Sequence, residues 1–153
     1  MSELVIRQSI EVAAPAETMW RVLTDNDLIP QYMFGCVTET DWKPGSPLLW
    51  RGAADGKVYV KGAIVEYDAP RRLVYTVIDP NGTIADVPEN YLTMTCTIQP
   101  RGPRACTLEL TQGDFAAVAN GAERYQHSQQ GHEAILAAMK ALAEKEARSP
   151  TLG

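Results

Sequence analysis

The sequence predicts an α+β domain in which about seven antiparallel strands form a curved sheet around a long C-terminal helix. Three observations lead to this fold class. Within residues 121–147, spacings of three and four place on one face, as in a helix, Tyr125, Ser128, His132, Ile135, Leu136, Met139 and Leu142. Residues 36–111 are short alternating segments separated by turns rich in Pro, Gly, Asn and Asp. Turns this short join antiparallel neighbours.

Length and charge restrict the classes of function. The 153 residues, 45% of them apolar, fit a single domain, which we place at residues 1–147 with a flexible tail at 148–153. A net charge of -5 without basic clusters argues against a nucleic-acid partner. The sequence has no long apolar run and no leader pattern, so we expect no membrane span and a cytoplasmic location. Three cysteines without a CxxC motif fit reduced thiols.

The first third of the chain predicts one strand and two short helices. Residues 4–12 alternate apolar and polar side chains, as a half-buried strand does. Pro15 suits the first turn of a helix that runs to about Asp25. Its buried stripe would be Met19, Trp20, Val22 and Leu23. Residues 26–34 predict a second short helix.

Six further strands are predicted, and the last two form the clearest hairpin. The long connection at residues 80–89 is expected to be mobile. A hairpin folded about Arg101 would place Cys96 opposite Cys106, as two small core residues rather than a disulfide. The predicted strands are 37–42, 48–52, 58–67, 73–78, 92–98 and 106–111.

The C-terminal helix has two unlike halves. Its second half carries ordinary core residues, namely Ile135, Leu136, Met139 and Leu142. Its first half carries polar side chains on the same face and an interior glycine, Gly131, which costs roughly 1 kcal/mol against alanine. We therefore expect close packing at Gly131, and a helix that closes the sheet at one end and covers a pocket at the other.

The order of elements and five local phrases resemble the helix-grip superfamily (START-like or SRPBCC domains), and within it the family similar to activators of the heat-shock ATPase. The phrases are residues 10–15 leading to Met19-Trp20, 62–66, 71–76, 107–112 with Asp114-Phe115, and Gly131-His132 followed by Leu136 and Met139. The resemblance implies a seven-stranded sheet gripping the C-terminal helix, with an apolar cavity between them. One departure is His132, because the family usually has tryptophan after the helix glycine.

The resemblance implies three kinds of function. Members of the superfamily bind lipids, polyketides or other small hydrophobic ligands, some catalyse cyclisation or related steps, and one branch stimulates the ATPase of a heat-shock chaperone. We favour a cytoplasmic binding protein for a small hydrophobic ligand, acting as a monomer or homodimer. The alternatives are a chaperone activator acting through an exposed protein interface and a cyclase or dehydratase. Fold does not select among them.

Candidate site residues come from the aromatic strand positions and from the polar half of the helix. An apolar pocket with a few hydroxyl groups would use side chains of this kind. We predict that Met33 and Phe34 guard its mouth. The other predicted ligand contacts are Trp50, Ile64, Tyr75, Tyr91, Met94, Tyr125, Ser128, Gln129 and His132.

Two residues are weak candidates for catalysis. His132 could orient a ligand carbonyl or move a proton, or could be a helix residue at the cavity rim without chemistry. Glu66 could be an inward carboxylate with a raised pKa, but pairing with an arginine such as Arg72 is the commoner arrangement. No metal or cofactor is expected, since His127 and His132 lie about 140° apart around a helix.

Overall fold

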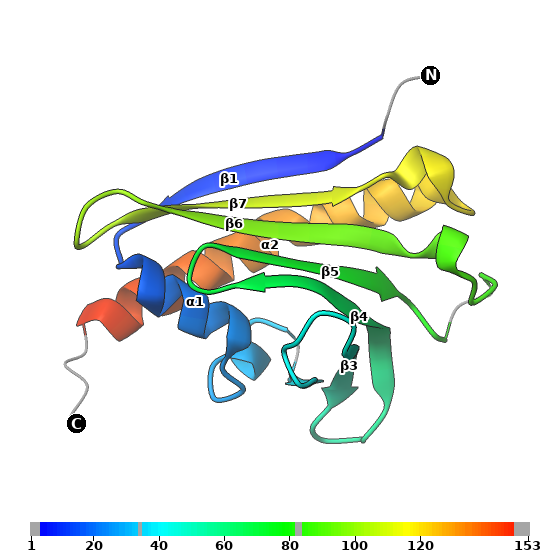
Figure 1. Ribbon diagram of the computed structural model, residues 1–153, viewed down its shortest axis with the longest axis horizontal. Helices are drawn as coiled ribbons and strands as arrows, with labels where there is room; N and C mark the ends of the chain where they lie inside the picture. The colour runs from blue at the N-terminus through cyan, green and yellow to red at the C-terminus, as the bar shows by residue number, and fades with distance from the viewer. Residues whose placement is uncertain (1–3, 34, 82–83, 149–153) are drawn as a thin grey trace.

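The computed structural model describes residues 4–33, 35–81 and 84–148 and contains one seven-stranded antiparallel sheet (Figure 1). The strands follow the order β1-β7-β6-β5-β4-β3-β2, so every strand from β2 to β7 pairs with its neighbours in the chain. This arrangement confirms the predicted fold class. The strands are Ile6–Val12 (β1), Cys36–Glu39 (β2), Pro47–Gly52 (β3), Val58–Asp68 (β4), Arg72–Ile78 (β5), Leu92–Pro100 (β6) and Cys106–Gly113 (β7).

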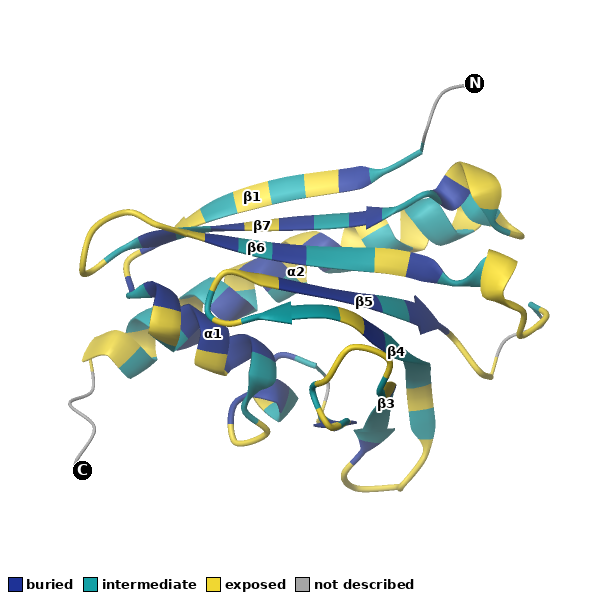
Figure 2. Ribbon diagram, viewed as in Figure 1, coloured by how far each residue is buried: buried dark blue, intermediate teal, exposed yellow. Residues whose placement is uncertain are grey.

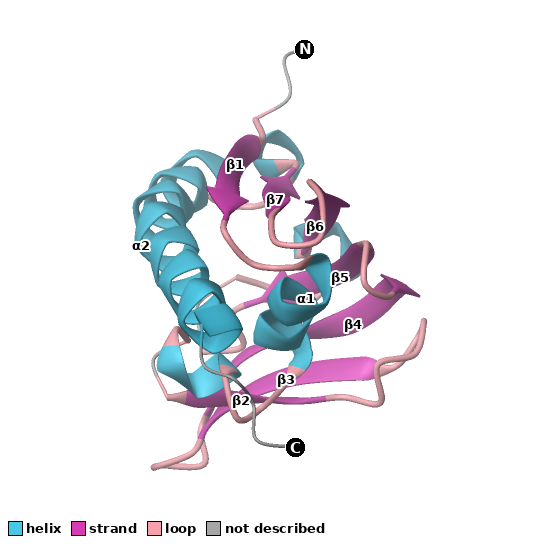
Figure 3. Cartoon of the chain, turned by 90° about the vertical axis from the view of Figure 1, so that its left-hand side faces the viewer, coloured by secondary structure: helices cyan, strands magenta, loops and turns pink. Residues whose placement is uncertain are grey.

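The sheet is strongly curved, and both α-helices lie on its concave side (Figure 3). Helix α1 spans Ala16–Thr24 and helix α2 spans Gly121–Arg148. Three 3-10 turns complete the fold: η1 (Ile29–Gln31), η2 (Pro88–Asn90) and η3 (Phe115–Ala117). Helix α1 begins after an extended Pro15 and buries the predicted stripe, and α2 matches the predicted helix to within one residue.

The second short helix predicted at residues 26–34 is reduced to the single turn η1. The Asn26 side chain accepts a hydrogen bond from Thr38 N and donates one to Thr38 O, both at 2.8 Å. The carboxylate of Asp25 accepts from the backbone of Asp27 at 2.9 Å. Side chains that bind backbone groups in this way compete with helix formation. Phe34, at the end of this segment, lies outside the described residues.

The register of the last hairpin differs from the prediction. Cys96 lies opposite Leu110, and Cys106 lies opposite Pro100. The reason is a turn displaced toward the C-terminus, closed by the hydrogen bond from Arg101 N to Ala105 O. The residue opposite Cys96 is thus four positions later than predicted. Because four is an even number, every side chain keeps its predicted face. Both thiols are buried and free, but they are not a cross-strand pair.

Helix α2 is anchored along its C-terminal part. Between residues 132 and 148 it buries His132, Leu136, Met139, Leu142 and Ala143 (Figure 2). Glu144 accepts a hydrogen bond from Ala13 N at 2.9 Å, and Lys140 donates to Glu11 O at 2.8 Å. No residue between 121 and 131 is buried. We call residues 132–148 the anchored half of α2 and residues 121–131 the open half.

Candidate functional site

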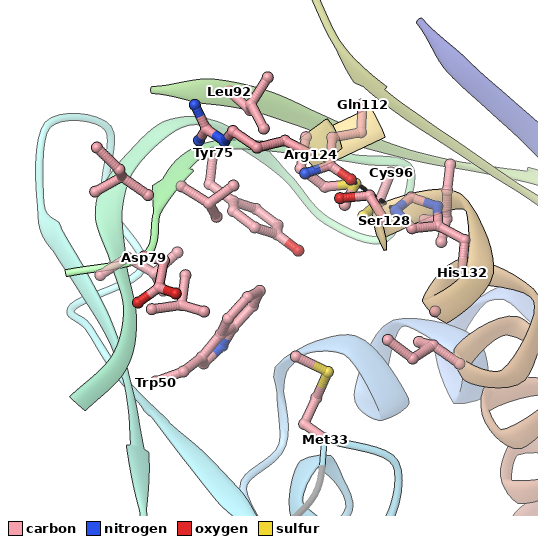
Figure 4. A pocket seen from close by; sticks show the side chains of 18 of the residues that line it. Met33, Trp50, Tyr75, Asp79, Leu92, Cys96, Gln112, Arg124, Ser128 and His132 are labelled. Carbon is pink, nitrogen blue, oxygen red and sulfur yellow. Dashed lines mark hydrogen bonds between the residues drawn. The ribbon is translucent and has the colours of Figure 1, made fainter. Parts of the chain in front are cut away.

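A cavity of about 500 Å³ lies between the concave face of the sheet and the open half of α2 (Figure 4). Pockets that hold small organic molecules have about 300–1,000 Å³, so the volume suits such a ligand. Helix α2 forms one side of the wall, and strands β3, β5, β6 and β7 form the other. Its apolar members include Leu48, Trp50, Leu73, Tyr75, Val77, Leu92, Met94 and Leu110.

The structure brings six of the predicted contact residues to this cavity. They come from the segment after η1, from three strands and from α2, and they are Met33, Trp50, Tyr75, Met94, Ser128 and His132. Alternation along the strands did not tell the inner face from the outer one, but Trp50, Tyr75 and Met94, chosen as aromatic or apolar strand residues, do line the cavity. That these residues touch a ligand remains a prediction.

Other predicted contacts lie elsewhere. Ile64 is only 1% exposed and belongs to the closed core. Tyr125 stacks edge-on against Phe115, with ring centroids 5.5 Å apart. Gln129 is exposed to solvent. The cavity-lining stripe of α2 runs through Arg124, Ser128 and His132, so Tyr125 and Gln129 each lie one position around the helix from it.

Glu66 is not an inward carboxylate. It is about half exposed and pairs with Arg72, whose Nε lies 3.2 Å from Glu66 Oε1. The pairing of β4 with β5 shifts between Ile64 and Glu66, and the extra residue is Val65. Strict alternation would have placed Glu66 on the face of Ile64, and this bulge changes the face. The structure therefore has the commoner of the two predicted arrangements.

Two aromatic side chains define the apolar end of the cavity. Trp50 and Tyr75 meet edge to face, with centroids 5.6 Å apart and planes at 83°. Trp50 Nε1 donates to Thr38 Oγ1 at 2.8 Å, which fixes the indole. The Tyr75 hydroxyl points into the cavity (Figure 4). Burial raises the pKa of Tyr75 well above its ordinary value, so the group stays a neutral phenol that can donate or accept a hydrogen bond.

His132 and Gln112 form a buried polar pair beside the cavity. His132 Nε2 lies 2.7 Å from Gln112 Oε1, and each residue is only 6% exposed. Because an amide oxygen only accepts, this contact places the ring proton on Nε2. Nδ1 is buried and has no hydrogen-bond partner within the described residues. Burial also lowers the pKa of His132, which favours the neutral ring. The pair fixes the Gln112 amide at the cavity wall.

Arg124 is a cavity residue that the sequence analysis missed. Its Nη1 donates to Asn90 O at 3.1 Å and to Ala119 O at 3.3 Å, at the open end of the cavity. Burial lowers the pKa of Arg124, while the nearby Asp79 acts in the opposite direction. The spacing of four and eight residues to Ser128 and His132 was a signal that could have identified it.

The loop from β5 to β6 borders the mouth of the cavity. Tyr91, a predicted ligand contact, instead donates to Asp86, which also pairs with Lys61. Asn81 Nδ2 donates to Val58 O at 2.8 Å. Tyr91 is therefore a residue that ties this loop to the sheet. The loop residues that do line the cavity are Asp79 and Ile84.

Gly131 lies on the cavity-lining stripe of α2. A Cβ atom built there would meet nothing within 4 Å. The expected close packing at this position is therefore wrong. The missing side chain leaves open space beside Ser128 and His132.

The described residues contain neither a membrane-spanning helix nor a cluster of metal ligands. None of the helices in the described ranges has the length and hydropathy needed to cross a membrane. Within residues 4–33, 35–81 and 84–148, no three His, Cys, Asp or Glu side chains lie close enough together to hold a metal ion.

Comparison with known protein families identifies the chain. Residues 13–144 match the family described as "Activator of Hsp90 ATPase homolog 1-like protein". The protein belongs to this family. The match covers α1, all strands except β1, and α2 almost to its end, so the family assignment rests on the whole fold that encloses the cavity. No match was found among curated proteins.

Solved structures support the same fold. A protein from Cytophaga hutchinsonii is 29% identical, with a TM-score of 0.75 over 97% of this chain and 100% of the other. A protein from Mesorhizobium loti is 17% identical, with a TM-score of 0.74 over 92% and 97%. An HSP90 activator from Plasmodium falciparum is 19% identical, with a TM-score of 0.59 over 72% of each chain. At this identity the last two similarities show the fold alone.

Proposed function

We propose that this member of the family binds a small, largely apolar molecule in the cavity between the sheet and α2. The observation that carries the proposal is the cavity itself, about 500 Å³ in volume and walled mainly by apolar side chains. Each Å² of apolar ligand surface removed from water there contributes roughly 25 cal/mol to binding. The Tyr75 hydroxyl and the Ser128 side chain would set the orientation of the ligand.

The experiment that tests this proposal is native mass spectrometry on protein purified from its own host. Denaturation would release any bound compound for identification. A stoichiometric apolar compound is the expected result. Protein that is free of any compound from the host, and that binds no member of a library of apolar molecules, would contradict the proposal.

A matched pair of variants shows whether the compound occupies the cavity. Ser128→Trp adds a large side chain on the cavity-lining stripe and should abolish binding. Gln129→Trp adds the same side chain at the adjacent exposed position and should leave binding unchanged. Equal loss in both variants would place the compound outside the cavity.

A second candidate function is activation of a chaperone ATPase through a protein interface. The description of the matched family favours it, and the similar protein from Plasmodium falciparum is itself described as an HSP90 activator. Among the described residues, Tyr59, Val65 and Val87 are the large apolar side chains exposed to solvent. The test is co-elution with the host Hsp90 and a rise in its ATPase rate. Absence of both would rule out this candidate, and replacing Val65 by aspartate would test whether the apolar surface is the contact.

A further inference from the structure

Within the described part of the chain, Arg124 lines the cavity without a carboxylate partner, unlike the arginines that form ion pairs on the surface. Arg51, Arg71 and Arg72 each lie within 4 Å of a carboxylate on the protein surface. Arg124 has no carboxylate within that distance among the described residues, although it is half-buried at the cavity. One nitrogen, Nη1, makes both of its hydrogen bonds. Within the described residues, Nε and Nη2 have no partner, so the guanidinium still has donors to offer.

These donors lie at the polar end of an otherwise apolar cavity. Gln112 and Ser128 lie near His132, the Arg124 guanidinium extends from α2 toward Tyr75 and Leu92, and Trp50 lies across the cavity from all three (Figure 4). The Gln112 amide is held in place by His132. A molecule that filled this space would therefore meet apolar walls along its body and fixed hydrogen-bond donors at one end.

Two acidic residues, Asp79 and Glu123, also line the mouth of the cavity. Neither approaches Arg124 to within 4 Å, so neither forms a direct ion pair with it. A partly desolvated guanidinium without a direct counter-ion gains most from a planar anionic partner, because its forked N–H groups match the two oxygens of a carboxylate.

We propose that the ligand is an amphiphile with a carboxylate that binds Arg124 and an apolar body that lies against Trp50, Tyr75 and Met94. Ser128 and Gln112 line the same cavity and offer further polar groups along it. This inference rests on the proposed function, because it assumes that the cavity is occupied. It adds the chemical class of the ligand and the residue that selects it.

The test compares probes that share one apolar body and differ in head group. Decanoate, decan-1-ol and decylamine are titrated at pH 7.5 by calorimetry, and 2-naphthoate and 2-naphthylmethanol repeat the comparison with a ringed body. Because a hydrogen bond to a charged group is worth more than a neutral one, each carboxylate should bind roughly tenfold tighter than its alcohol. Decylamine should bind more weakly than decanoate.

Variants assign the preference to Arg124. Arg124→Gln should remove the preference for the carboxylate while the alcohol keeps its affinity, and Arg124→Lys should keep part of the preference. Arg104→Gln removes the same charge from the exposed turn between β6 and β7 and should change nothing. The alcohol titration also shows that the Arg124→Gln variant keeps its fold and its cavity.

Each other outcome overturns the inference in a recognisable way. If the carboxylates and alcohols bind equally and Arg124→Gln has no effect, the head-group assignment is wrong and the proposed function stands. If decylamine binds tightest, the acidic residues at the mouth select the ligand. If Arg124→Gln weakens carboxylate and alcohol equally, the residue only holds the loop of Asn90 in place. If no probe of either shape binds, the proposed function fails together with the inference.

Discussion

The anchored and open halves of α2 are one continuous helix, yet they meet the sheet differently. The anchored half buries Leu136, Met139 and Leu142. Hydrogen bonds of Lys140 and Glu144 hold it to β1 and to Ala13, just after that strand. The open half buries no residue and borders the cavity with Arg124, Ser128 and Gly131. The difference shows that one end of the helix supplies stability, which leaves the other end free to carry polar groups and empty space.

The largest expected effect on stability comes from truncating a buried side chain in the anchored half, compared with a cavity-facing side chain in the open half. Leu136→Ala removes a side chain that is 5% exposed and lies away from the main cavity, so it should lower the free energy of unfolding by about 2–5 kcal/mol. Ser128→Ala removes a hydroxyl that faces the cavity and should change it by less than about 0.5 kcal/mol. Urea unfolding followed by circular dichroism measures both.

Equal losses in the two variants would break the comparison, because they would mean that the open half packs as tightly as the anchored half. Met139 is a poorer choice for the first variant, since it is buried and also lines the cavity. Its truncation would mix stability with ligand binding.

Substitutions at two glycines of α2 should have smaller effects on stability, of opposite sign, and they test how much space surrounds the open half. Gly131→Ala should raise the free energy of unfolding by about 1 kcal/mol, since alanine favours a helix and its Cβ would meet nothing within 4 Å. Gly121→Ala should lower the stability, because a Cβ there would lie 1.7 Å from Phe115 O. Thermal unfolding of the two variants gives the signs. A loss of stability in Gly131→Ala would show that the space beside this residue is already filled.

His132 should make stability depend on pH at the boundary between the halves. Burial lowers its pKa in the folded protein below the ordinary value of 6.5, which the unfolded chain keeps. The unfolded state therefore binds more protons below about pH 6.5, and the free energy of unfolding should fall as the pH falls through that value. The fall should end once the pH is below the pKa of the folded protein.

Urea unfolding between pH 5 and pH 8 measures this slope. His132→Gln should flatten it, whereas His127→Gln, at an exposed position on the same helix, should leave it in place. A slope that is unchanged in His132→Gln would assign the dependence to other groups. Measuring ligand binding in the same variant also tests whether His132 acts in the cavity beyond holding Gln112.

Periodicity in the sequence was enough for the seven strands, α1 and α2 and for their order, but not for the segment at residues 26–34 or for every face. Strand alternation separated two faces without showing which is concave, and Trp50, Tyr75 and Met94 were predicted to line the cavity from their chemistry. At Glu66 alternation would mislead, because a single bulged residue, Val65, reverses it without any glycine or proline to mark the place. The hairpin register failed because the turn was centred by symmetry rather than by the hydrogen bond that closes it.

The face of α2 that lines the cavity shows a different limit of prediction from the sequence. Apolar residues define its direction well in the anchored half, where Leu136 and Met139 pack. In the open half the cavity-lining residues are polar, and the predicted polar stripe ran from His132 and Ser128 to Tyr125, so it missed Arg124, one position away. The direction set by His132, Ile135 and Met139 leads back to Ser128 and Arg124 at steps of three and four. The cavity-lining residues of a partly packed helix are therefore best predicted by continuing the three- and four-residue spacing of its packed half into the polar half.

The smallest expected effect concerns Glu66, which lies in β4 and belongs to neither half of α2. Its ion pair with Arg72 is about half exposed, and such pairs contribute about 0–1 kcal/mol. Glu66→Gln should therefore change the free energy of unfolding by less than about 1 kcal/mol and leave probe binding at the cavity unchanged. A double-mutant cycle with Arg72→Gln measures the coupling. If Glu66→Gln instead altered binding or any turnover, the bulge at Val65 would not be present in solution, because only strict alternation turns this carboxylate toward the concave face.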